Sequence, residues 1–116
     1  MNIEQEILSS LTVYMKYSKY IPELKRRETW TELVDRNKQM HQEKFPQLKD
    51  EIEKAYELVY AKKVLPSMRS LQFAGRPIEL NNSRIFNCSF LPIDDMRAFS
   101  EIMFLLLSGC GVGYSV

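Results

Sequence analysis

Apolar residues recur at helical spacing through the first half of the chain. Between residues 3 and 15 they form one stripe, at spacings of one, three and four: Ile3, Ile7, Leu8, Leu11, Tyr14 and Met15. This spacing predicts an amphipathic helix, which would end in the aromatic, proline-containing loop 17–22. Thr29 followed by Glu32 is typical of a capping box. It predicts a second helix to about residue 43, before Pro46.

A third helix is predicted from about residue 48 to residue 63. Two lysines in its last turn suit the negative end of the helix dipole, and Pro66 would stop it. Its apolar face would hold Ile52, Ala55, Tyr56, Val59 and Tyr60.

The pattern changes after residue 64, where all four glycines lie. Segments 70–73 and 84–91 are predicted as strands or extended segments, separated by turns. Asp94 and Asp95 suit a helix N-terminus. The helix that follows would carry an apolar stripe and end in a glycine-rich turn; the stripe is Phe99, Ile102, Met103 and Leu106. We therefore expect a helical region over residues 1–63 and a mixed α and β region over residues 64–116.

Composition narrows the classes of function. A length of 116 residues indicates one compact domain at most, and 45% hydrophobic residues are enough for a core. The net charge of +1 argues against a nucleic-acid partner held by a strongly basic surface. No run of 18 apolar residues and no signal peptide occur, so we expect a cytoplasmic protein with no membrane partner.

Cysteine and histidine are scarce. Two cysteines, Cys88 and Cys110, exclude a disulfide-stapled scaffold and a four-cysteine zinc site. The single histidine, His41, argues against a histidine-based metal centre or a serine–histidine–aspartate triad. We place His41 on an exposed helix face, assign it no role, and expect no metal site.

Gly109, Gly111 and Gly113 alternate after a predicted helix. A dinucleotide fingerprint needs the opposite order, a strand before the glycines and a helix after them. Alternating glycines also let a backbone approach a flat ligand closely. The other interpretation is a glycine helix cap followed by a strand.

Three further features have two interpretations each. Cys88 lies in a strand predicted to be buried, where a cysteine is either a small hydrophobic residue or a redox thiol, and Cys110 is its only possible thiol partner within the chain. Segment 66–70 offers two hydroxyls and Arg69, either as a phosphate site or as a solvated turn. The basic run 25–27 is either a solvated loop, which we favour, or a binding site.

Three blocks, in order, resemble the start of the catalytic barrel of a ribonucleotide reductase large chain. They are similar to the adenosylcobalamin-dependent class II group, above all to its monomeric branch. Segment 64–71 resembles its Pro-Ser-Gly-Arg-x-Leu segment, and segment 87–90 its Asn-Cys-x-Phe strand. Segment 107–116 resembles its Gly-Gly-Gly-Val-Gly-Phe-Ser-Val turn. The regions around Tyr20–Pro22 and Glu28–Trp30 fit more loosely.

The resemblance implies an α+β fragment, in which N-terminal helices precede the first strands and a helix of a ten-stranded α/β barrel. It implies that Cys88 is the first redox cysteine, which donates an electron and a proton as the ribose 2′-hydroxyl leaves and then forms a disulfide. Asn87 would line the substrate pocket, Gly111 would pack against the base, and Ser67 would lie near the phosphates. The partners implied are a ribonucleotide and a thioredoxin-like reductant.

Two residues depart from the pattern: Cys110, where Gly, Thr or Ala is expected, and Met68, in place of glycine. The thiyl-radical cysteine, the second redox cysteine and most adenosylcobalamin contacts would belong to the remaining C-terminal part of the reductase, without which this chain would be inactive. Two alternatives stay open. One is the large chain of a class I reductase of phage or bacterial type, which uses a separate radical subunit. The other is a non-catalytic helical interaction module, a decayed remnant.

Overall fold

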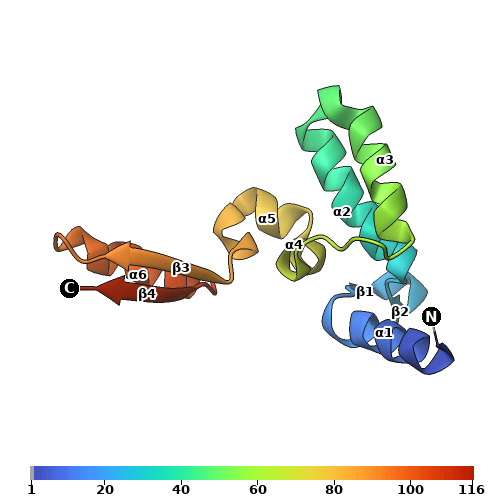
Figure 1. Cartoon of the computed structure of the whole chain (residues 1–116), viewed down its shortest axis with the longest axis horizontal. Coiled ribbons are helices and arrows are strands. Elements are labelled where there is room, and N and C mark those ends of the chain that lie inside the picture. Colours follow the sequence, from blue (N-terminus) through green and yellow to red (C-terminus); the bar gives the residue numbers. More distant parts are fainter. Residues whose placement is uncertain (1) are drawn as a thin grey trace. The chain divides into compact units, whose positions relative to one another are not determined.

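The computed structural model describes residues 2–116, which form two compact units, divided between Gly75 and Arg76 (Figure 1). The helices and strands of the first unit are α1 (Ile3–Lys16), β1 (Tyr20–Ile21), β2 (Arg26–Arg27), α2 (Trp30–Lys44), α3 (Lys49–Tyr60) and α4 (Met68–Phe73). Those of the second are α5 (Arg76–Leu80), β3 (Cys88–Pro92), α6 (Arg97–Leu107) and β4 (Gly111–Ser115). Short 3₁₀ turns occupy Pro22–Leu24, Pro46–Leu48 and Asn82–Ile85.

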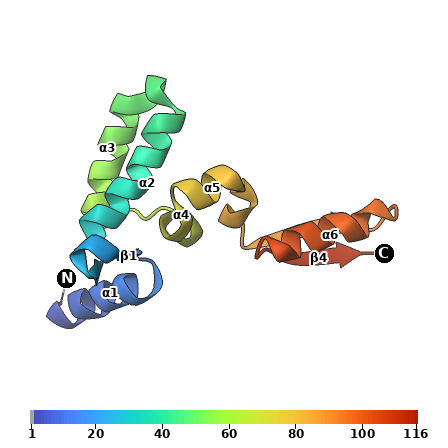
Figure 2. The same cartoon turned by 180° about the vertical axis from the view of Figure 1, so that it is seen from behind.

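The predicted capping box is present at the start of α2. The Thr29 hydroxyl accepts a hydrogen bond from the Glu32 backbone N–H at 3.4 Å, and the Glu32 carboxylate accepts one from the Thr29 N–H at 2.7 Å. α2 and α3 lie side by side as a helical hairpin (Figure 2). Their shared core contains Val34, Tyr56 and Val59, with Trp30, Ile52 and Tyr60 packed against it. Ala55, predicted on this face, is exposed.

Residues 17–27 contain a short β-hairpin, whereas the sequence predicts loops at residues 17–22 and 25–27. Tyr20–Ile21 and Arg26–Arg27 pair as an antiparallel hairpin. Arg26 makes a bidentate ion pair with Glu32, at 2.7 and 2.8 Å, and the Arg27 guanidinium donates to the Ser18 carbonyl at 3.1 Å. The prediction of a solvated basic loop is therefore wrong for both arginines, because neighbouring carboxylate and carbonyl oxygens bind them.

The strand predicted over residues 70–73 is wrong, because this segment is helix α4. The Leu71 N–H donates to the Ser67 carbonyl at 3.0 Å, and Ser70, Leu71 and Ala74 are buried in the first unit. The expected turn at residues 75–77 also differs in part, since α5 begins at Arg76, with Pro77 in its first turn, where a missing N–H costs nothing. Residues 64–75, which we assigned to the second region, thus belong to the helical unit.

The second unit is built on a strand–helix–strand motif. β3 and β4 are parallel, with Cys88 opposite Gly111 and Pro92 opposite Ser115, and α6 connects them (Figure 1). The glycine cap interpretation is confirmed at the end of α6. Gly109 has φ of +85°, and the Gly109 and Cys110 N–H groups donate to the carbonyls of Leu106 and Leu105, which is a Schellman motif.

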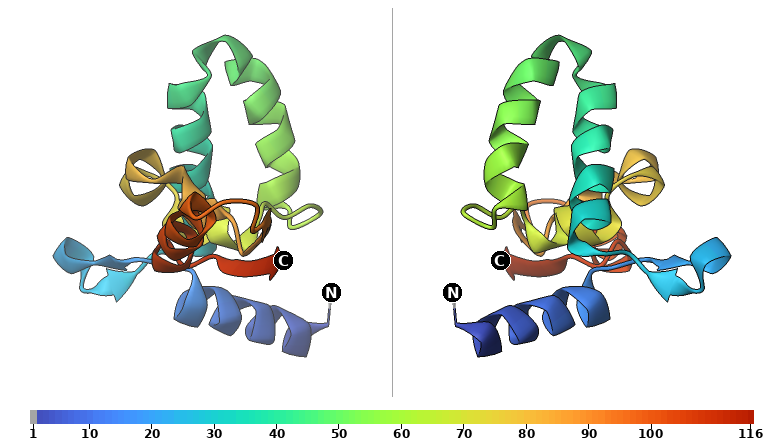
Figure 3. Two further views of the ribbon diagram at one scale, coloured as in Figure 1. Left: turned by 90° about the vertical axis from the view of Figure 1, so that its left-hand side faces the viewer. Right: turned by 90° about the vertical axis from the view of Figure 1, so that its right-hand side faces the viewer.

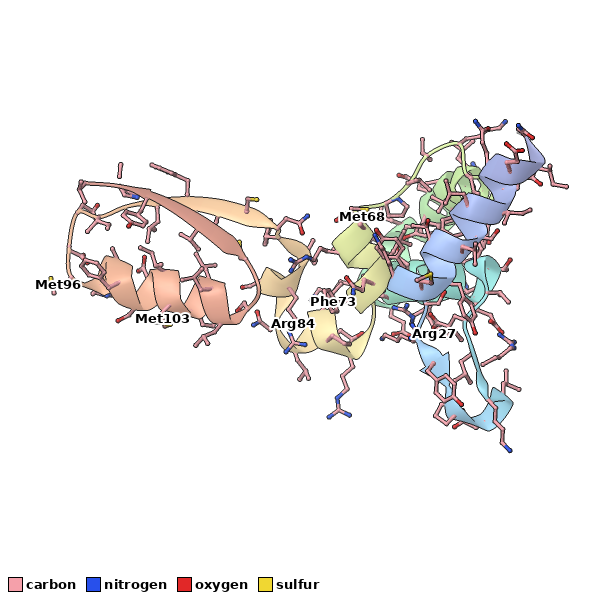
Figure 4. All side chains as sticks on the ribbon, turned by 90° about the horizontal axis from the view of Figure 1, so that it is seen from below. Arg27, Met68, Phe73, Arg84, Met96 and Met103 are labelled. Carbon is pink, nitrogen blue, oxygen red and sulfur yellow. The ribbon has the colours of Figure 1, made fainter. Side chains whose placement is uncertain are left out.

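The buried face of α6 is rotated from the predicted one. Ala98 is buried, and Ile102 and Leu105 are half-buried. Phe99 and Met103 are more than half exposed, and Figure 4 shows Met103 on the side of α6 away from the strands. Among residues 2–116, none of the helices combines the length and the apolar character needed to cross a bilayer.

Candidate functional site

Parallel pairing brings three of the four predicted site residues together. Cys88 is the first residue of β3 and lies opposite Gly111, the first residue of β4. The Gly111 N–H donates to the Asn87 carbonyl at 2.8 Å, so this hydrogen bond joins the two strand starts. Asn87, Cys88 and Gly111 are all exposed. Together these three residues are called the strand-start site below.

The exposure of Cys88 corrects the prediction of a buried strand. Successive side chains of a strand point to opposite faces of the sheet. Leu91 lines a hollow with α6 residues, and half-buried Ser89 contacts the buried Cys110, so these residues lie on the face that α6 covers. Cys88 therefore lies on the face that α6 leaves uncovered, together with Phe90, which is 67% exposed.

The two thiols lie in different environments. The Cys110 thiol is buried, 2% exposed, and donates a hydrogen bond to the Ser89 hydroxyl at 3.3 Å. Cys88 is exposed on the other face of the sheet. The two-stranded sheet thus separates the sulfur atoms, and a Cys88–Cys110 disulfide would require the strands to rearrange.

Gly111 and Gly113 are extended strand residues, and of the three alternating glycines only Gly109 has a positive φ. A Cβ atom at Gly111 would lie 3.5 Å from the Asn87 carbonyl oxygen, an ordinary contact. The absence of a side chain at Gly111 therefore leaves open space on the uncovered face beside Cys88. A flat ligand could contact the backbone there.

Ser67 lies in the other unit, directly before α4. Its side chain makes no capping hydrogen bond. The second hydroxyl of the predicted phosphate segment is not free, because the buried Ser70 hydroxyl accepts a hydrogen bond from the Asn37 amide at 2.9 Å. This segment therefore offers a phosphate the Ser67 hydroxyl and Arg69, but not Ser70.

Sequence reasoning missed a buried polar cluster around Asn37. This side chain is 0% exposed, donates to the Ser70 carbonyl at 2.9 Å and accepts from the Tyr56 hydroxyl. His41 Nδ1 lies 2.9 Å from the Asn37 carbonyl oxygen and 3.1 Å from the Tyr56 hydroxyl. His41 is therefore half-buried against this cluster and does not lie on an exposed helix face as predicted. Burial raises the pKa of Tyr56 to about 12, which keeps its hydroxyl protonated as a donor.

A second missed cluster surrounds the buried carboxylate of Glu28. Arg36 donates two hydrogen bonds to it, at 2.8 and 2.9 Å, and the Lys19 N–H donates at 3.0 Å. Burial raises the pKa of Glu28, but these hydrogen bonds outweigh that effect and hold the pKa below its usual value. Arg36 and the Lys19 ammonium both donate to the Ala74 carbonyl, so the cluster connects the β1–β2 hairpin to the end of α4.

Ligands of open parallel sheets generally bind beyond the carboxyl ends of the strands. The strand-start site lies at the amino ends of β3 and β4. The rule therefore does not point to the strand-start site, and its assignment as a candidate site rests on the identity of Asn87, Cys88 and Gly111. Among residues 2–116, no group of three or more His, Cys, Asp and Glu side chains is arranged to hold a metal ion.

Comparison with protein-family models, curated proteins and solved structures finds no match for this chain.

Proposed function

We propose that this chain is the N-terminal part of a ribonucleotide reductase catalytic chain of the adenosylcobalamin-dependent class. The proposal rests on the three sequence blocks that resemble this class. What supports it most in the structure is the pairing of Cys88 with Gly111 on the uncovered face of a parallel strand–helix–strand motif. A thiol and an unobstructed backbone then lie side by side, as a pocket that holds a ribose and its base would require.

The open edges of the sheet are consistent with such a role. The β3–β4 sheet has only two strands in the structure, and parallel sheets are normally larger and covered on both faces. Phe90 of β3 and Phe99 and Phe104 of α6 are each more than half exposed. We propose that the remaining C-terminal part of the reductase covers these surfaces by adding strands to the sheet.

The chemistry proposed for Cys88 is one half of a two-thiol reduction. Cys88 and a second cysteine from the remaining part each give one electron and one proton. The C2′–O bond of the ribonucleotide breaks, the hydroxyl leaves as water, and a C2′–H bond forms while the two thiols become one disulfide. A thioredoxin-like dithiol then reduces this disulfide by exchange and is itself oxidised. Exposure of Cys88 suits both steps, because substrate and reductant must reach its sulfur.

Two open grooves lie on the described residues, one beside α6 and one along α1, and neither is lined by the strand-start site. We propose that adenosylcobalamin is bound mainly by the remaining C-terminal part of the reductase.

The test is turnover in the completed enzyme. The chain is co-expressed with the product of the adjoining reading frame, and deoxyribonucleotide formation is measured with adenosylcobalamin and a dithiol reductant. Cys88→Ser is expected to abolish multiple turnover and to leave substrate binding within a few-fold, because serine has similar size but cannot form a disulfide. Cys110→Ala is the matched control and is expected to keep activity within a few-fold. Normal turnover of Cys88→Ser would refute the proposed role.

An interaction module without chemistry is the second candidate. One observation favours it: α1 presents its apolar stripe to solvent, as a helix that binds a partner would. If the adjoining reading frame encodes no further barrel strands, this candidate replaces the first.

A further inference from the structure

Asn81 lies outside the strand-start site, between α5 and the 3₁₀ turn Asn82–Ile85. Its half-buried side chain uses both ends of its amide. The Nδ2 group donates to the Ser108 hydroxyl at 3.1 Å, and the Oδ1 atom accepts from the Ser83 N–H at 3.1 Å. This one side chain therefore joins two segments that are 27 residues apart in the sequence.

Both segments lead directly to the strand-start site. Ser108 is fixed on the last turn of α6, because its hydroxyl donates to the Phe104 carbonyl at 2.9 Å. The chain then turns and enters β4 at Gly111. On the other side, the 3₁₀ turn that follows Asn81 leads to Asn87. The Asn81–Ser108 hydrogen bond thus connects the chain just before β3 to the chain just before β4.

The strand starts lie at an open end of the sheet. There the Gly111 N–H donates to the Asn87 carbonyl at 2.8 Å. Hydrogen bonds at the ends of a sheet open more readily than those in its interior. Both views of Figure 3 show α6 on one side of the two strands, and the exposed Cys88 lies on the opposite side. A hydrogen bond on the α6 side, such as that of Asn81, can therefore limit this opening without filling the exposed face.

We propose that Asn81 is a positioning residue for the strand-start site, an inference that rests on the proposed function. By holding Ser108, Asn81 fixes the start of β4 and therefore the distance between the Gly111 backbone and the Cys88 thiol. A base packed against Gly111 and a ribose over Cys88 belong to one substrate molecule, so their two supports must keep a fixed spacing. Asn81 contacts neither support and acts through Ser108.

The two hydrogen bonds of Asn81 can be separated by substitution. Aspartate has the same shape and keeps the oxygen that accepts from the Ser83 N–H, but it has no N–H group to donate. The Ser108 hydroxyl cannot replace this donor while its own proton is bonded to the Phe104 carbonyl. Asn81→Asp therefore removes the connection to Ser108 and retains the cap of the 3₁₀ turn.

Amide hydrogen exchange of the full chain tests this connection without any turnover. Asn81→Asp and Ser108→Ala are each expected to speed exchange of the Gly111 N–H about fivefold, the effect of one lost hydrogen bond. The Ile93 N–H, which is bonded at the carboxyl ends of the strands, is expected to keep its rate. Asn82→Ala, at the exposed neighbouring asparagine, is the matched control and is expected to change neither rate. A general loss of stability would speed both amides alike and would overturn the proposal.

Kinetics of the completed enzyme test the consequence for the substrate. Asn81→Asp and Ser108→Ala are each expected to raise KM for the ribonucleotide about fivefold and to leave kcat within about twofold, because contact with the base weakens equally in the ground and transition states. The double variant is expected to match either single variant, because both remove the same hydrogen bond. An unchanged KM, effects that multiply in the double variant, or an equal rise in Asn82→Ala would overturn the positioning role.

Failure of the proposed function would give a different result. If the wild-type complex forms no deoxyribonucleotide, or if Cys88→Ser turns over normally, the assignment to a reductase fails and the positioning role falls with it. An active wild-type complex in which Asn81→Asp keeps a normal KM would refute the role of Asn81 alone.

Discussion

Asn37→Ala is the substitution whose cost the structure defines most closely. Asn37 is fully buried, and its side chain binds the Ser70 carbonyl, the Ser70 hydroxyl and the Tyr56 hydroxyl. Alanine leaves the Ser70 carbonyl and hydroxyl without this partner, in addition to a small cavity, while the Tyr56 hydroxyl keeps His41 Nδ1 at 3.1 Å. Each unpaired buried group costs about 1 kcal/mol or more. We therefore expect the free energy of unfolding to fall by about 2–4 kcal/mol.

Urea denaturation followed by fluorescence measures this change. Trp30 is the only tryptophan and donates from its indole to the Tyr60 carbonyl at 3.2 Å, so its emission reports on the α2–α3 pair. Gln39→Ala is the matched control, because Gln39 is exposed on the same helix and bonds only Glu43. It is expected to cost no more than about 0.5 kcal/mol.

A double-mutant cycle with Tyr56→Phe identifies the coupled pair. Tyr56→Phe alone removes one hydroxyl and is expected to cost about 1 kcal/mol. The double variant is expected to cost less than the two single costs together by about 1 kcal/mol, because the Asn37–Tyr56 hydrogen bond is lost only once. If Asn37→Ala is as stable as the Gln39→Ala control, the buried network is not formed and the reasoning fails.

Three other predictions concern separate features. Lys25→Gly is expected to raise the free energy of unfolding by about 0.5–1 kcal/mol in the same assay, because exposed Lys25 has φ of +50°, a left-handed conformation that glycine adopts without strain. An unchanged or lower stability would contradict the positive φ at Lys25. The free energy of unfolding is expected to fall as the pH drops through about 4, because the Glu28 carboxylate, whose pKa is lowered in the fold, stabilises the fold only while it is charged. Glu28→Gln should make the free energy of unfolding less dependent on pH in this acid range, and an equally steep dependence would refute the prediction. Ellman's reagent is expected to label Cys88 at least about 100-fold faster than Cys110, and equal rates in Cys88→Ser and Cys110→Ala single-thiol variants would refute their assigned exposures.

Most helices follow from local signals in the sequence. The capping box at Thr29, the stripe of α3 and the glycine after α6 each act over a few residues, and the structure confirms them. α4 could not be predicted in this way, since its six residues have no clear period. It is held by a contact with Asn37, which lies far away in the sequence and donates to the Ser70 carbonyl. The sequence did carry one signal for that contact. Asn37 is a polar residue three positions after Val34, on the helix face that otherwise carries apolar residues.

The residues of the candidate site come from the sequence resemblance alone, and its geometry could not be predicted from the sequence. The resemblance selected Asn87, Cys88 and Gly111, and only the parallel register brings the last two together. Whether Cys88 is buried depends on which face of the sheet α6 covers. A strand pattern of alternating polar and apolar residues does not settle this when both faces carry large apolar side chains, such as Phe90 and Leu91.

The redox role of Cys88 is the central claim, and the disulfide formed in one turnover tests it most directly. The completed enzyme is allowed one turnover without added reductant, alkylated, digested without reduction and analysed by mass spectrometry. We predict a peptide that joins Cys88 to a cysteine of the remaining part, with Cys110 alkylated only after denaturation, because the sheet separates the two thiols of this chain. A Cys88–Cys110 peptide, or Cys88 recovered as a free thiol after product has formed, would contradict the proposed function.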